Sequence, residues 1–320
     1  MSETSQPPLV HHLARVCVPP PYSNRGVKVH GFPIAVERDR LQDLCDAWFA
    51  APSGGAVRYR ALLSAVFILV VHIDEIAPEN PAHADEGRTP EIDVGLWTLV
   101  ARAEPFSLVP RWLPLRLLVD SADAVVVGRE VYGFPKELGR CDVPPSAPSR
   151  GPFAVAGNVT PYPGDVMRWS DVLRVEPTDA PPLPRPAVWR TIAEANIAWQ
   201  LWLSTHLDPA VFDVETRQSM IKAASLQLLP FLFLKQTIAA SGRDSACYQA
   251  VIEASPSLRV FRLGGVNPAS FRAQVSSYPS HPFESVLGIP SGAWLDVGHG
   301  IWADLDFTMG EGNVLFDTTG

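Results

Sequence analysis

Short apolar segments rich in β-branched residues alternate with turn residues across positions 26–176. Runs of this length, bounded by Gly, Pro and Asp, are typical of β-strands. The pattern predicts a mostly antiparallel sheet built from the segments VKVHGFPIAV, AVFILVVHI, LRLLVD, DAVVVGREVY and FAVAGNV. One helix is expected among them in ERDRLQDLCDAWF, where apolar residues recur at helical spacing.

The periodicity changes between residues 187 and 255. An apolar stripe at helical spacing is formed by Val188, Ile192, Ala195, Trp199 and Trp202. This stripe belongs either to the core or to the wall of a ligand pocket. A second helix is predicted from Asp213 to Gly242, kinked at Pro230.

Strand character returns after residue 258, in LRVFRLGGV, FRAQVSSY, AWLDVGHGIWADLDFTM and NVLFD. The helices at 187–255 therefore look like a helical insertion within one β-rich domain that spans residues 1–320. The predicted class is α+β, mainly β. Chain length alone also allows two domains.

Composition narrows the functions that remain possible. Hydrophobic residues make up 47% of the 320 residues and charged residues 19%, which is ample for a packed core. The net charge of -8 provides no concentrated basic face for a polyphosphate backbone. Nucleic acid is therefore excluded as an expected partner.

The cysteines and the apolar runs favour a cytoplasmic protein without membrane contact. The four cysteines lie far apart with no C-x-x-C pair, so neither a zinc site nor a disulfide framework is expected. The apolar run LLSAVFILVVHI is far shorter than the ~20 residues that span a bilayer, and the first residues do not resemble a signal peptide. PPPY at 19–22 has the letters of a WW-domain ligand, but a proline-rich entry segment is the favoured interpretation.

No nucleotide-binding or hydrolase motif is present, and no metal or cofactor is expected. What remains is GREVYGFPKELGR, in which Lys136 follows a Gly-Phe-Pro turn close behind a run of valines. A neutral lysine amine attacks a ketone to give an iminium ion, whose nitrogen accepts electrons from a breaking bond. A solvent-exposed turn lysine is the alternative.

GREVYGFPKELG resembles the signature of the acetoacetate decarboxylase family, in which the matching lysine forms a Schiff base. Weaker similarity extends to NRGVKVHGFPIAVERDRLQDL and GIWADLDFTMGEGNVLFDT. The resemblance implies a closed antiparallel β barrel or cone with flanking sheet, and makes Lys136 the nucleophile. It also implies a pocket glutamate, for which Glu91 is the best counterpart.

Two positions depart from the family pattern. Glu137 replaces a second lysine, and its carboxylate would hold Lys136 charged unless it points to the opposite face of an extended strand. His30 stands where the family carries an arginine thought to meet the substrate carboxylate. Loss of these groups would change the substrate or the fate of the imine.

The expected site combines the matched lysine with polar and aromatic residues near it in the sequence or in the alignment. Lys136 is the nucleophile, Glu91 or Glu130 is the proton donor or orienting group, and Arg129 neutralises charge. Further substrate contacts are assigned to His30, Tyr132, Phe134 and Glu137.

Three classes of function follow. The first is a Schiff-base lyase acting on a small oxo acid or ketone, with aldol, dehydration or cyclisation chemistry favoured over simple decarboxylation; true acetoacetate decarboxylation is the alternative within this class. The second is a noncatalytic small-molecule binder on the same fold. The third is a protein-interaction module that uses PPPY and the apolar helices, for which self-association into a homo-oligomer is expected.

Overall fold

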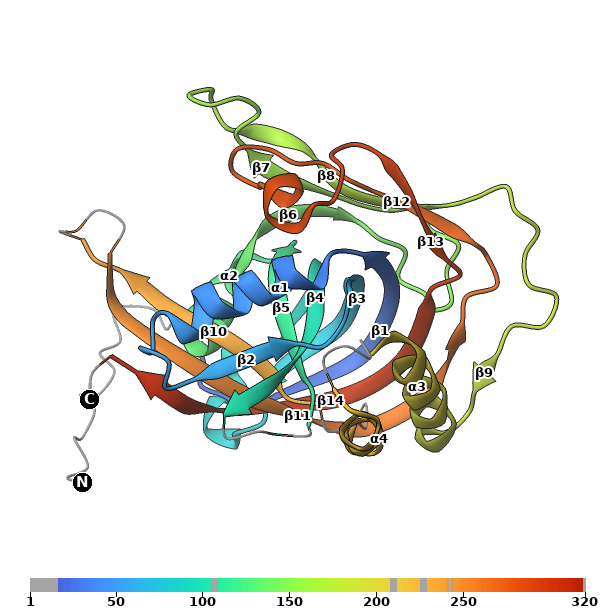
Figure 1. The fold of residues 1–320 in the computed structure, drawn as a ribbon, viewed down its shortest axis with the longest axis horizontal. Helices are drawn as coiled ribbons and strands as arrows, with labels where there is room; N and C mark the ends of the chain where they lie inside the picture. The colour runs from blue at the N-terminus through green and yellow to red at the C-terminus, as the bar shows by residue number, and fades with distance from the viewer. Residues whose placement is uncertain are drawn as a thin grey trace.

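The structure is a computed structural model that describes residues 17–104, 107, 109–207, 212–224, 229–240, 242 and 245–318. It is a mainly β structure of the α+β class (Figure 1). The strands are β1 (Tyr22–Ala35), β2 (Arg58–Ala61), β3 (Ala65–Pro78), β4 (Thr89–Glu104), β5 (Arg111–Val119), β6 (Lys136–Asp142), β7 (Phe153–Val159), β8 (Arg168–Pro177), β9 (Val188–Trp189), β10 (Phe231–Ile238), β11 (Ala246–Val266), β12 (Phe271–Val275), β13 (Trp294–Gly298) and β14 (Ile301–Asp317). The α-helices are α1 (Arg38–Cys45), α2 (Ala122–Val127), α3 (Ile192–His206), α4 (Val214–Ala223) and α5 (Phe283–Leu287).

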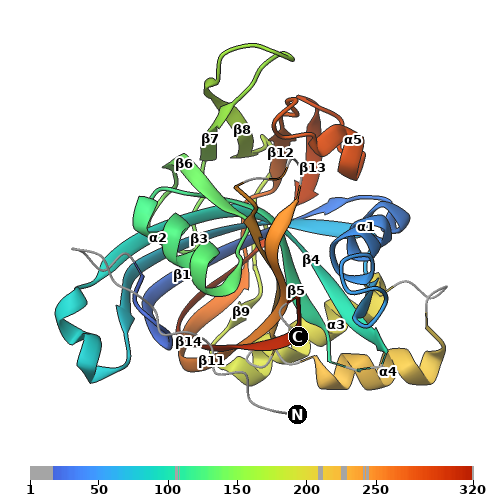
Figure 2. The same cartoon turned by 90° about the vertical axis from the view of Figure 1, so that its left-hand side faces the viewer.

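Within the described residues, seven strands are joined in a ring of pairings. β1 lies between β14 and β3, β3 pairs with β4, and β4 pairs with β5, all antiparallel. β10 and β14 each pair with β11, and β10 also meets β5 at Phe231 and Trp112, which completes the ring. The long strands curve around a common interior (Figure 2).

A second set of strands extends the sheet from β5 through β6 to β7, β8, β12 and β13. β6 runs parallel to β5, with Lys136 opposite Leu117. Both ribbon views place β7, β8, β12 and β13 on one side of the ring and α3 and α4 on the other (Figure 1, Figure 2). The largest apolar core lies between the ring and the second set, where Phe32 contacts both Phe153 and Phe271.

Among the described residues, the helix predicted from Asp213 to Gly242 is present only at Val214–Ala223. α4 ends at Ala223, and Phe231–Ile238 instead forms β10, which pairs along its length with β11. Pro230 supplies no amide hydrogen for a continuing helix, and the ladder to β11 satisfies the backbone groups that follow it. Among the described residues of the region 187–255, helix is therefore limited to α3 and α4, and β11 begins at Ala246.

The strand predicted in DAVVVGREVY is also wrong. Residues Ala122–Val127 form α2 and Gly128–Tyr132 form a π-helical turn. Ser121 caps α2 by accepting a hydrogen bond from the Ala124 amide at 3.3 Å, which competes with the β preference of the three valines. Gly133 ends the turn in the left-handed region at φ 89°.

Other predictions are confirmed. The helix expected in ERDRLQDLCDAWF is α1 with its π-helical continuation at Asp46–Ala50, and the strands expected after residue 258 are present. Of the predicted apolar stripe, Ala195 and Trp199 are buried on α3, whereas Val188 is exposed and belongs to β9. No helix in the described part of the chain is long and apolar enough to span a membrane.

The WW-ligand interpretation of PPPY is wrong. Tyr22 begins β1, is only 7% exposed, and donates its hydroxyl hydrogen bond to the Val18 carbonyl. A buried tyrosine in a strand is not available to a partner domain.

Candidate active site

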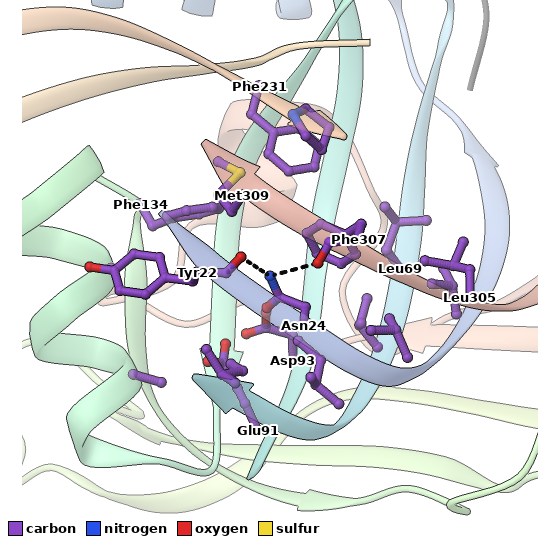
Figure 3. A pocket seen from close by; sticks show the side chains of 18 of the residues that line it. Tyr22, Asn24, Leu69, Glu91, Asp93, Phe134, Phe231, Leu305, Phe307 and Met309 are labelled. Carbon is purple, nitrogen blue, oxygen red and sulfur yellow. Dashed lines mark hydrogen bonds between the residues drawn. The ribbon is translucent and has the colours of Figure 1, made fainter. Parts of the chain in front are cut away.

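A cavity of about 680 Å³ lies inside the strand ring, and all seven ring strands contribute to its wall. Alternate residues of β1 and β3 face it, as Val27 and Val29 of β1 and Leu69 and Val71 of β3 do. The wall is mainly apolar and aromatic. Figure 3 shows Glu91 and Asp93 next to each other in the cavity wall, among apolar side chains such as Leu305.

Lys136 enters the cavity because of the turn that precedes it. The backbone passes from the π-helical turn through Gly133, Phe134 and Pro135, and β6 begins at Lys136 itself. A Cβ on Gly133 would lie 2.5 Å from the backbone of Lys235 in β10, so this position needs glycine as much for space as for its φ. A Cβ on Gly128 would meet the Lys136 side chain at 2.8 Å.

The Lys136 amine is buried beside two carboxyl groups. The residue is 7% exposed, and Nζ donates a hydrogen bond to Glu91 Oε1. Asp93 Oδ2 lies 3.7 Å from the same nitrogen, and the Phe134 ring centre lies 5.0 Å from it. Glu91 and Asp93 are alternate residues of β4, so both side chains point to one face of the sheet.

These contacts determine how the groups titrate. Burial lowers the pKa of the Lys136 ammonium, but the attraction of Asp93 and Glu91 outweighs it and the net shift is upward. Burial, reinforced by the neighbouring Glu91, raises the pKa of Asp93 well above its ordinary value. Lys136 is therefore held in its ammonium form beside the two carboxyl groups, and Asp93 takes up a proton more readily than an ordinary aspartate.

Four of the expected residues lie together on the cavity. Lys136, Glu91, Tyr132 and Phe134 all line it. The Tyr132 hydroxyl donates to the Gly310 carbonyl at 2.7 Å, so this residue presents mainly its ring to the cavity. Lys136 is accordingly not the exposed turn lysine that was the alternative.

His30 does not face the cavity. It is 1% exposed and packs against Phe153, 4.8 Å between ring centres, in the core between the ring and the second set of strands. Val29 faces the cavity, and strand alternation sends the next side chain to the opposite face. Burial lowers the pKa of His30 to about 4, so the ring is neutral.

Glu137 also lies outside the cavity. It accepts hydrogen bonds from Arg116 Nε at 2.9 Å and pairs with His281 Nε2 at 2.6 Å. Burial raises the pKa of this carboxyl, but His281 and Arg116 together outweigh burial and lower it. The carboxylates that hold Lys136 charged are therefore Glu91 and Asp93, not Glu137.

Arg129 and Glu130 are exposed and belong to the π-helical turn. Neither is among the described residues that line the cavity. The structure does not bring them to the cavity, because a helical turn, unlike the predicted strand, directs them outward. Arg129 Nη1 donates to the backbone carbonyl of Lys136 at 3.5 Å.

The residue that sequence reasoning missed is Asp93. The signal was the alternation in PEID, because a strand that presents Glu91 to a pocket also presents the residue two positions on. Trp97 was also missed as a cavity residue. Trp199, whose stripe was expected in the core or in a pocket wall, lines the cavity as well. Within the described part of the chain neither indole Nε1 has a hydrogen-bond partner.

The fold has known counterparts among solved structures. The acetoacetate decarboxylase of Legionella pneumophila subsp. pneumophila str. Philadelphia 1 matches with a TM-score of 0.61 at 12% identity, over 99% of this chain and 95% of that chain. The chain has an acetoacetate decarboxylase-like fold. No protein-family model and no curated protein matches the sequence itself.

Two further structures share the acetoacetate decarboxylase-like fold. The enduracididine biosynthesis enzyme MppR, complexed with the condensation product of pyruvate and imidazole 4-carboxaldehyde, matches with a TM-score of 0.57 at 14% identity, over 98% of each chain. An acetoacetate decarboxylase-like enzyme from Sphingomonas wittichii RW1 matches with a TM-score of 0.55 at 14% identity, over 96% of this chain and 98% of that chain.

Proposed function

We propose that this chain is a Schiff-base-forming lyase with Lys136 as its nucleophile. The observation that carries the proposal is a buried amine in an apolar cavity, bonded to one carboxylate and within 3.7 Å of a second carboxyl group. Those are the parts that imine chemistry requires: a nucleophile, a base and an acid.

Imine formation is balanced without any further reactant. Glu91 takes a proton from the Lys136 ammonium, and the amine lone pair then adds to the carbonyl carbon of the substrate. Asp93 protonates the carbonyl oxygen to a hydroxyl group, and the Asp93 carboxylate then takes a proton from the added nitrogen. The proton held by Glu91 goes to the hydroxyl group, which leaves as water while the nitrogen lone pair forms the C=N bond. The net change is ammonium plus ketone to iminium plus water.

The raised pKa of Lys136 is compatible with this reaction. The iminium carries the same single positive charge as the ammonium that it replaces, so Glu91 remains the counterion throughout. Glu91, which disfavours the neutral amine of Lys136, thus stabilises the iminium intermediate. Loss of a proton from the Lys136 ammonium is then an early step, after the substrate has bound.

Glu91 and Asp93 fit carbon–carbon or dehydration chemistry after the imine has formed. Glu91 removes a proton from the carbon next to the iminium, the C–H electrons move to nitrogen, and an enamine results. When the enamine carbon attacks a second carbonyl group, Asp93 protonates the new alkoxide. The MppR structure, which holds a condensation product, supports this choice over decarboxylation.

The substrate's charge also bears on the choice. Among the described cavity residues, the cations are Lys136, bonded to Glu91, and Arg88, whose Nη1 lies 2.8 Å from Glu75. A substrate carboxylate would meet Glu91 and Asp93 without a cation of its own. Decarboxylation of a β-keto acid is the second candidate, favoured by the match to acetoacetate decarboxylase itself.

Residues 1–320 are proposed to form one acetoacetate decarboxylase-like domain, with the strand ring as its closed barrel and α3 and α4 as its helical insertion. The continuous pairing from β13 to β2 supports a single unit. Assembly as a homo-oligomer remains a proposal, checked by light scattering.

Intact-mass spectrometry after incubation with acetone or pyruvate and cyanoborohydride tests the enzyme proposal. We expect a covalent increment on Lys136 that is lost in Lys136→Ala and kept in Lys222→Ala, a matched change at an exposed lysine on α4. If a folded protein gains no increment with either carbonyl compound, the chain is a noncatalytic binder and Lys136 is only a buried charge.

A further inference from the structure

The cavity continues well beyond the Lys136 amine. Phe134 contacts Trp97 at 6.4 Å between ring centres, Trp97 contacts Phe231 at 5.5 Å, and β10 sets Phe231 opposite Trp112. Trp112 in turn contacts Trp199 of α3 at 5.7 Å. All of these rings line the same cavity, so an aromatic wall leads from Lys136 to α3.

The volume is too large for a small oxo acid. A protein cavity of about 150 Å³ accommodates benzene, whereas this one measures about 680 Å³. Acetoacetate has little more than the heavy atoms of benzene, so it would leave most of the space empty. Cavities of roughly 300–1,000 Å³ are those that enclose drug-sized ligands.

The polar groups of the wall select an uncharged ligand. Next to Lys136, the carboxyl groups of Glu91 and Asp93 disfavour a negatively charged group on the ligand. Along the aromatic wall, the buried indole N–H groups of Trp97 and Trp199 find no acceptor among the described residues. A neutral oxygen on the ligand would satisfy them.

We infer that the substrate is an uncharged ketone or aldehyde with an extended apolar body, alkyl or aryl, that lies along the aromatic wall and reaches α3. The inference rests on the proposed function in one respect: the carbonyl end is placed at Lys136. The apolar body is placed by the cavity alone, and the two parts are tested separately.

The cavity is tested with secondary alcohols, which form no imine. Calorimetry on the unaltered chain compares 2-propanol, 2-pentanol, 2-heptanol and 2-nonanol with the anion nonanoate. Burial of each added methylene strengthens binding by up to about fourfold, so we expect a steady gain along the alcohols and weaker binding of nonanoate than of 2-nonanol. Binding that is flat with length, or tighter for nonanoate, overturns the inference.

The α3 end is tested by narrowing the cavity. Ala195 is buried and lines the cavity, whereas Ala193 is exposed on the same helix. We expect Ala195→Phe to lower the ratio of 2-nonanone to acetone trapping at Lys136 by about tenfold or more. Ala193→Phe should leave this ratio at the value of the unaltered chain. An unchanged ratio in folded Ala195→Phe contradicts the inference, and Ala195→Leu replaces that variant if it does not fold.

The two proposals fail differently. If 2-nonanol binds tightly but no ketone is trapped, the cavity inference stands and the imine chemistry is wrong. If acetone and 2-nonanone are trapped equally well and the alcohols show no length dependence, the imine chemistry stands and the extended substrate is wrong.

Discussion

Two neighbouring residues of β6 each sit in an ion-paired group, on opposite faces of the strand. Glu137 lies on the face away from the cavity and is hydrogen-bonded to both Arg116 and His281, so its carboxylate has a partner on two sides. Lys136 has one bonded carboxylate, while Asp93 Oδ1 beside it has no hydrogen-bond partner within the described residues. A charged group whose hydrogen-bonding atoms all have partners, such as Glu137, is more typical of a structural role. A carboxyl group with an unpaired oxygen at a cavity wall, such as Asp93, is more typical of a catalytic site.

The largest expected effect comes from Glu91. Glu91→Gln removes the base that the proposal uses at the carbon next to the iminium, so hydrogen–deuterium exchange of acetone in D₂O should slow about 10²–10⁴-fold. NMR measures this exchange directly. Glu137→Gln is the control on the other face of β6 and should exchange at the rate of the unaltered chain. If both variants lose exchange equally, the contrast between the two faces is wrong.

His30 tests whether titratable groups away from the cavity affect stability alone. Its folded pKa of about 4 lies below the ordinary 6.5, so the unfolded chain binds more protons between these values and stability falls as pH drops through them. His30→Phe should remove about 3 kcal/mol of that acid destabilisation by pH 4. Urea unfolding at neutral and acidic pH measures the difference. An equal acid loss in both proteins would show that His30 is not the cause.

Glu137→Gln should destabilise the fold by about 1–3 kcal/mol, because it leaves Arg116 and His281 without their anion. The expected loss of stability is smaller than for a fully buried ion pair, because the Arg116 side chain is 36% exposed to solvent. Denaturant unfolding at neutral pH measures the loss, with unchanged acetone trapping in the folded protein. A loss of trapping without a loss of stability would place Glu137 in the reaction.

The smallest expected effect is a shift in the pH dependence of acetone trapping in Asp93→Asn. Because Asp93 helps to raise the pKa of Lys136, the acetone-trapping rate of the unaltered chain should still rise with pH well above neutrality. Asp93→Asn removes that attraction, so the rising limb should move to lower pH by about one unit or more. Trapping rates across the pH range measure the shift. If the trapping rate rises over the same pH range in Asp93→Asn as in the unaltered chain, Asp93 does not raise the pKa of Lys136.

Part of this site was accessible from local sequence. The Gly-Phe-Pro turn before Lys136 depends on residues within a few positions of each other, whereas Glu91 was identified through the family resemblance. A strand that carries Glu91 also alternates its side chains between two faces. The same alternation, applied more fully, would have found Asp93 and rejected His30. The outward direction of Arg129 and Glu130 was missed because the valine run before them was read as strand although it is capped as a helix by Ser121.

The sequence by itself determined the β-rich class, the α1 helix, the strands after residue 258 and the approach to Lys136, since short-range periodicity and turn chemistry govern these features. Tertiary structure decided the rest. β10 is a strand because β11 supplies its hydrogen bonds, and the Lys136–Glu91 pair joins residues 45 positions apart. The cavity exists only once seven strands close their ring, because no single segment encodes the space that distant segments enclose.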